Sequence, residues 1–140
     1  MTPGRAHAGY DIVTIAPHLA HSALARRVAT LLDSYFTAVN HRDYRRYSLL
    51  FGRWHQLTLR KFLAGYRSTR DSRATLIGLA RNRRALIATV TFQSRQAPAA
   101  SPDHARCDDW VIKLYLRPDG GRYLIVPPPA RYGARYHACG

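Results

Sequence analysis

Carboxylate side chains are the groups in this chain best suited to moving protons, and they are few. The sequence contains eight aspartates and seven histidines, and it contains no glutamate. A buried carboxyl with a raised pKa acts as a general acid or base near neutral pH. We find no paired carboxylates, no glycine-rich phosphate loop and no nucleophile elbow. Any acid–base chemistry must therefore depend on a single aspartate and its neighbours.

Local sequence explains most of these aspartates without any chemistry. Cap, turn, loop and strand-end positions account for Asp43, Asp71, Asp103, Asp108, Asp109 and Asp119. We expect these residues to lie at the surface, opposite some of the many arginines. Only Asp33, beside the apolar face of a predicted helix, is placed to approach an interior cavity.

The first half of the chain has the spacing of helices. Apolar residues recur every three or four positions from Ser22, which is a good N-cap, to about Asn40. Asp43 predicts the cap of a second short helix, and Thr58 predicts the cap of a third. Gly65 lowers the stability of the third helix by up to about 1 kcal/mol relative to alanine, so this helix is the weakest of the three predictions.

From residue 73 onward the spacing changes to that of strands. Apolar and polar residues alternate in the predicted strands 74–80, 86–93, 109–117 and 122–126. A Pro-Asp-Gly-Gly turn joins the last two strands into an antiparallel hairpin. Residues 12–15 are either an edge strand or part of a disordered leader. The fold class is therefore α+β.

Helices followed by hairpin strands predict a cone. The N-terminal helices would pack in the concave face of a curved, mostly antiparallel sheet, and the open mouth would offer a pocket. Five aromatic residues are candidates to line it: Tyr35, Tyr47, Trp54, Tyr66 and Trp110. The alternative is that they are simply core. The predicted domain covers residues 21–130, between a poorly ordered leader (1–20) and a C-terminal tail (131–140).

The chain is strongly basic. Lysine and arginine number 22 against eight acids, which gives a formal net charge of +14. Such a charge attracts polyanions, but nonspecific nucleic-acid binding of this origin is weak, with dissociation constants of about 10⁻⁴ to 10⁻⁶ M. The arginines are spread over every predicted element, which favours a solvated basic surface. No segment approaches the ~20 apolar residues of a membrane span, and no signal peptide is apparent.

Four segments together resemble a known superfamily. They are LLDSYFTAVNHRDYRRYSLLF, FLAGYRSTRD, ATVTFQSRQ and CDDWVIKLYLRPDGGRYLI, in that order. The pattern is similar to the nuclear transport factor 2-like superfamily, and more narrowly to its bacterial SnoaL-like members with a cystatin-like cone. In that family an aromatic-rich first helix precedes Asn-x-x-Asp, which Asn40 and Asp43 match here. The resemblance covers about residues 22–126.

The resemblance implies an α+β cone that often forms a homodimer through its sheet. Family members include isomerases, cyclases and dehydratases as well as non-catalytic binding domains, and the fold does not choose among them. Its enzymes use an acid, or an acid and a histidine, inside the cone. In this sequence Asp33 and His55 are the residues that would fill those roles. A surface aspartate paired with an arginine is the plainer interpretation of Asp33.

The resemblance also bears on the only two cysteines. Similar sequences place one cysteine just before the tryptophan strand and another near the C-terminus, which implies a disulfide between Cys107 and Cys139. A bridge would imply an extracytoplasmic location, and free thiols a cytoplasmic one. A Cys₂His₂ zinc site with His104 and His137 is the remaining alternative, although His137-x-Cys139 is tighter than usual zinc spacings.

Three hypotheses follow. The first is a non-catalytic cone domain that binds a small apolar ligand or a protein partner, without metal or cofactor. The second is a SnoaL-like isomerase, cyclase or dehydratase that uses Asp33 and His55. The third is a basic module that binds polyanions such as nucleic acid.

Overall fold

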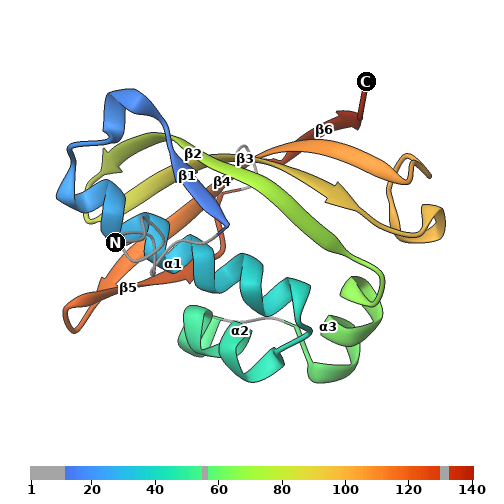
Figure 1. Ribbon diagram of the computed structural model, residues 1–140. Coiled ribbons are helices and arrows are strands. Elements are labelled where there is room, and N and C mark those ends of the chain that lie inside the picture. The colour runs from blue at the N-terminus through green and yellow to red at the C-terminus, as the bar shows by residue number, and fades with distance from the viewer. Residues whose placement is uncertain (1–11, 55–56, 130–132) are drawn as a thin grey trace, which may run out of the picture.

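The computed structural model describes residues 12–54, 57–129 and 133–140. Three α-helices pack against a curved, mostly antiparallel sheet of six strands (Figure 1). The helices are α1 (Ala23–Asn40), α2 (Tyr44–Phe51) and α3 (Leu59–Tyr66). The strands are β1 (Val13–Ile15), β2 (Arg70–Asn82), β3 (Ala85–Arg95), β4 (Cys107–Asp119), β5 (Arg122–Val126) and β6 (Arg135–Ala138). Short 3₁₀ turns η2 (Pro17–Leu19), η3 (Gly52–Trp54) and η4 (Pro98–Ala100) connect them.

All three helices begin at the residues that the sequence predicts as caps. The Ser22 hydroxyl accepts a hydrogen bond from the Ala25 N–H, at 3.0 Å. The carboxylate of Asp43 and the hydroxyl of Thr58 do the same for α2 and α3. Each such cap contributes about 1 kcal/mol by satisfying an N–H that the helix leaves unpaired. No helix in the described ranges is long and apolar enough to cross a membrane.

The sheet order is β1-β2-β3-β4-β5, and β1 alone runs parallel to its neighbour. Strand β4 is long enough to serve two partners along its outer edge. Its second half pairs with β5 through the Pro-Asp-Gly-Gly turn, and its first half pairs with β6. In Figure 1 these two partners therefore lie at opposite ends of β4. Strand β6, in the C-terminal segment, therefore pairs with the part of the β4 edge that β5 does not reach.

The main core lies between α1 and one face of the sheet. Val28, Leu32 and Phe36 follow one another at the helical spacing, and each is at most 1% exposed. They meet fully buried sheet residues such as Leu76 and Val90. A second, smaller cluster forms where α1, α2 and α3 meet, around Phe62. The helices are therefore fixed both to the sheet and to one another.

Three segments differ from the sequence-based expectation in their extent. Of the two alternatives for residues 12–15, the structure shows the edge strand, β1. Strand β2 begins at Arg70, four residues earlier than the alternation predicts, because its polar start pairs with the end of β3. The C-terminal segment, expected to pack loosely, contains β6. In each case cross-strand pairing, which local composition does not encode, defines the strand.

Candidate functional site

A cavity of about 230 Å³ opens between α1, α3 and strands β2, β3 and β4. We call it the tyrosine pocket. The residues that matter for its chemistry are Tyr35, Tyr66, Asp71, Phe92, Asp108 and Trp110. Among the described residues, its lining contains two carboxyl groups and no arginine, lysine or histidine. In so basic a protein, this composition distinguishes the pocket from its surroundings.

Asp71 is held in place through its own backbone by the last residue of α1. The Asp71 N–H donates to the Asn40 side-chain oxygen at 2.7 Å, and the Asn40 amide donates to the Asp71 carbonyl at 2.9 Å. The Arg42 guanidinium bonds the carbonyls of Asn40 and Thr69, at 2.6 and 2.9 Å. Three of these four bonds join the end of α1 to the start of β2, and the Arg42–Asn40 bond is local. They leave the Asp71 side chain free to turn into the pocket wall.

The carboxyl of Asp71 is buried without a cation. The residue is 6% exposed, and its Oδ1 has no hydrogen-bond partner among the described residues. Burial raises its pKa to about 6, although a hydrogen bond with Ser94 favours the charged form. Such a group changes its charge close to neutral pH. Asp71 is therefore the residue in the pocket most able to bind or exchange a proton.

Asp71 is the first member of a polar row that crosses three strands. It is paired with Ser94 on β3, and Ser94 is in turn paired with Asp108 on β4. Residues directly opposite one another in a sheet point to the same face, with strands about 4.8 Å apart. The two aspartates are therefore separated by about 10 Å along the row. Beside it, Phe92 and Trp110 stack with ring centroids 6.2 Å apart.

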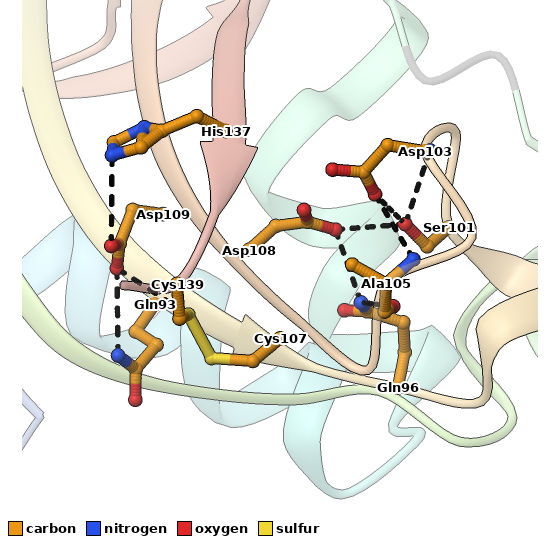
Figure 2. The surroundings of a disulfide bond; sticks show 10 residues. All are labelled: Gln93, Gln96, Ser101, Asp103, Ala105, Cys107, Asp108, Asp109, His137 and Cys139. Atoms are coloured by element: carbon orange, nitrogen blue, oxygen red, sulfur yellow. Dashed lines mark hydrogen bonds and ion pairs between the residues drawn. A yellow bond between two sulfur atoms is a disulfide. The ribbon is translucent and has the colours of Figure 1, made fainter.

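Asp108 is fully buried and belongs to a hydrogen-bonded cluster (Figure 2). Its Oδ2 lies 2.8 Å from the Ser101 hydroxyl and 3.1 Å from the Gln96 amide, whereas its Oδ1 has no hydrogen-bond partner among the described residues. Ser101 also hydrogen-bonds to Asp103. One hydroxyl proton is donated to only one carboxylate at a time, so the pair of acids favours the uptake of one added proton as the pH falls.

The environment places that proton on Asp108. Burial, with the nearby Asp103 carboxyl, raises the pKa of Asp108. The hydrogen bond with Ser101 lowers the pKa of the exposed Asp103. Asp108 is therefore the acid of the pair that takes up a proton more readily as the pH falls, and Asp71 is the second buried carboxyl of the pocket.

Three tyrosine hydroxyls lie close to one another behind and within the pocket wall, because Tyr66 acts on the pKa values of both Tyr35 and Tyr47. Burial is the largest cause that raises the pKa of each of the three phenols, so all stay protonated at neutral pH. A protonated phenol can donate a hydrogen bond to a ligand. Asp71 is close enough to raise the pKa values of Tyr35 and Tyr66 further.

The structure brings together three of the five predicted pocket aromatics. Tyr35, Tyr66 and Trp110 line the tyrosine pocket. Tyr47 packs behind it, with its ring centroid 6.1 Å from that of Tyr35. Trp54 lies elsewhere, in a separate hollow, where the Arg53 guanidinium sits 4.3 Å from its ring centroid.

The predicted acid–histidine pair is not found in this pocket. The Asp33 Oδ1 accepts a hydrogen bond from the Ile12 N–H at 2.7 Å, and Asp33 is absent from the pocket lining. This bond connects α1 to the residue that precedes β1. His55 lies outside the described residues, so its position relative to Asp33 stays a prediction.

The sequence analysis expected Asp71 and Asp108 at the surface, although the sequence does contain a signal for the burial of Asp108. The alternation that predicts a common apolar face for Trp110, Ile112 and Leu114 extends two residues back to Asp108. An aspartate on that face is expected to have its carboxyl in the interior of the protein. No comparable signal exists for Asp71, because the register of β2 shifts between Ser72 and Thr75.

Cys107 and Cys139 form a disulfide, as the family resemblance implies (Figure 2). Their Cα atoms are 5.4 Å apart, and the Cys139 N–H donates to the Cys107 carbonyl at 3.0 Å. The bridge joins the start of β4 to the residue that follows β6. Both sulfurs are used in this bond, so the oxidised protein has no thiolate to bind zinc.

No family model, characterised protein or solved structure matches this chain at a significant level. The superfamily resemblance therefore rests on the sequence segments alone.

Proposed function

We propose that this domain binds a small organic molecule in the tyrosine pocket and does no chemistry on it. Asp71 carries the proposal, because this buried carboxyl, with an oxygen that has no partner among the described residues, lines a cavity that also presents four aromatic side chains. Pockets for small molecules commonly combine apolar walls with a few convergent polar groups. Here the walls include Tyr35, Phe92 and Trp110, and the polar groups include Asp71 and Tyr66.

The size of the pocket limits the ligand. A volume of about 230 Å³ is slightly below the range of about 300–1,000 Å³ that is common for ligand pockets. We therefore expect a ligand of about one substituted ring. The phenol of Tyr66 would donate to it, and Asp71 would accept from it.

Gly65 offers a direct way to test the site. It lies in α3 at the rim of the pocket, and a Cβ added there would meet no atom within 4 Å. A tryptophan at this position therefore fits without a backbone clash and fills the rim. We expect Gly65→Trp to lose binding of a neutral aromatic probe, indole, measured by saturation-transfer NMR.

Native mass spectrometry of the purified chain will show whether a ligand co-purifies, and will report the oligomeric state of the protein.

The matched control is Gly65→Ala, which leaves the pocket open. It should keep indole binding and raise the free energy of unfolding by up to about 1 kcal/mol, because alanine favours the helix. Indole binding that is unchanged in Gly65→Trp would place the probe elsewhere and count against the proposal. Absence of indole binding and of any co-purified ligand in the wild type would do the same.

A second candidate function, proton transfer, is favoured by the pKa of Asp71, which is about 6. In this version Asp71 replaces Asp33 as the base of a SnoaL-like isomerase or dehydratase. Its carboxylate would take a proton from carbon next to a carbonyl, while the Tyr66 hydroxyl donates to the carbonyl oxygen.

Deuterium exchange separates this candidate from simple binding. The probe is cyclohexanone in D₂O, with uptake of deuterium beside the carbonyl followed by NMR. Proton transfer predicts exchange about 10²-fold or more faster with wild type than with Asp71→Asn. Asp109→Asn, a change on the opposite face of β4, should exchange as the wild type does. Equal rates of deuterium exchange with and without protein would count against proton transfer and leave binding as the proposed function.

A further inference from the structure

The tyrosine pocket differs in charge from the other hollows of the described surface. One hollow beside α1 and β5 is lined by Arg27 and Arg122. Two more, near the β2–β3 hairpin and η3, share Arg84 and Arg117. Each of these three hollows therefore presents positive charge, whereas the tyrosine pocket presents only carboxyl groups.

Asp71 lacks the ion-pair partner that a buried carboxylate normally has. The chain carries 22 lysines and arginines, yet the ion pairs among its described residues involve the exposed or half-exposed Asp43, Asp109 and Asp119. A buried charge without a partner carries a desolvation penalty of several kcal/mol. Natural proteins rarely retain such a group unless it has a partner or a function.

Building on the proposed binding function, we infer that the ligand of the tyrosine pocket is an organic cation, an amine on a small ring or apolar body. The cation would be the missing partner of Asp71. Because the negative charge is shared by both carboxylate oxygens, contact at either one compensates the whole group.

The walls of the pocket fit the same chemistry. Tyr35, Tyr66, Phe92 and Trp110 surround the cavity, and aromatic faces attract ammonium groups within about 6 Å of the ring centroid. An anionic ligand would instead meet Asp71 without any compensating cation. A neutral ligand would fit the walls but leave the Asp71 charge unpaired.

The titratable groups that act on Asp71 across the pocket are phenols and a carboxyl, whereas the nearby Arg42 guanidinium bonds the Thr69 carbonyl and forms no ion pair with Asp71 among the described residues. Tyr35 approaches from α1, Tyr66 from α3, and Asp108 lies across Ser94 on β4. None of these groups is positive at any pH. Protonation of Asp71 is therefore the event that removes the attraction, and cation binding should weaken as the pH falls below about 6.

The test compares two probes of matched shape, benzylamine as the cation and benzyl alcohol as the neutral form, by titration calorimetry at pH 7.5. We expect the wild type to bind benzylamine at least tenfold more tightly than benzyl alcohol. Asp71→Asn should abolish this preference. Asp109→Asn removes a negative charge from the other face of β4, where Asp109 points toward His137 (Figure 2), and should keep the preference.

The outcomes separate this inference from the proposed function. Equal affinity for both probes, or a preference that survives in Asp71→Asn, would overturn the cation inference. If benzyl alcohol still binds and Gly65→Trp still blocks it, the binding function would stand without the cation. If neither probe binds the wild type and indole does not bind either, both proposals fail.

Discussion

At the scale of the residue, Asp71 combines a fixed backbone with an unsatisfied side chain. Asn40 hydrogen-bonds both the N–H and the carbonyl of Asp71, while the Asp71 carboxyl has little exposure and no cationic partner among the described residues. A local change in Asn40 should therefore act on Asp71 without touching the pocket walls. The arrangement lowers stability at neutral pH, which is the usual consequence of a site organised for binding rather than for packing.

Asp71→Asn should stabilise the protein above pH 6. The pKa of Asp71 is about 6 in the folded chain against 3.8 for the ordinary value, so folding penalises the charged form. Its contribution is most favourable below pH 3.8 and is lost as the pH rises through 6. At pH 7.5 and above, the variant should gain up to roughly 3 kcal/mol over wild type, at 1.36 kcal/mol per pKa unit.

Urea unfolding at pH 4 and pH 8 measures this difference. The two proteins should converge at pH 4, where the wild-type carboxyl is largely protonated. Asp33→Asn serves as a comparison, because it removes an acid that already has a hydrogen-bond donor in Ile12. A variant that is equally destabilised at both pH values would show that the buried charge is not the determining factor.

At the scale of the element, β6 connects the disulfide to the pocket. The strand pairs with the first half of β4, and Tyr136 packs on Trp110 with ring centroids 4.8 Å apart. Trp110 in turn stacks on Phe92 in the pocket wall. The Cys107–Cys139 bridge therefore holds a strand that supports one wall of the site.

Reduction of the disulfide should lower stability and disturb Trp110. The bridge closes a loop of 32 residues, which corresponds to about 4 kcal/mol in the chain-entropy model. Thermal unfolding with and without reductant measures the loss, and tryptophan fluorescence in a Trp54→Phe background reports the environment of Trp110. A double Cys107→Ala, Cys139→Ala variant should be less stable and no longer respond to reductant. An unchanged melting temperature after complete reduction would contradict this expectation.

At the scale of the whole molecule, the net charge of the chain and the charge of the tyrosine pocket have opposite signs. The net charge of +14 would attract polyanions, and two of the arginine-lined hollows adjoin one another through Arg84 and Arg117, while the third lies beside α1 and β5. Binding of polyanions therefore stays a prediction. The tyrosine pocket, whose described lining is acidic, lies between the helices and the sheet. The predicted homodimer and the protein-partner alternative stay predictions, and native mass spectrometry of the purified chain tests the first.

Local patterns were sufficient to predict the three helices and the strands β2 to β5, but not β6. Caps at Ser22, Asp43 and Thr58 and the change from helical to strand spacing are encoded by neighbouring residues, so the α+β class was predictable. The bridge between Cys107 and Cys139 was implied by resemblance and is confirmed. The pocket was predictable only in outline, as a group of aromatics, three of which line it, while neither Asp71 nor Asp108 was among the predicted site residues.

The sequence by itself determined the three helices and most of strands β2 to β5, because hydrophobic period and capping are properties of residues a few positions apart. Only the tertiary structure decided which acid enters the interior. Asp71 owes its burial to Asn40, 31 residues away, and to a register shift in β2 that breaks the simple alternation. The desolvation of a carboxyl depends on everything packed around it, and that environment exists only once α1, α3 and the sheet have come together.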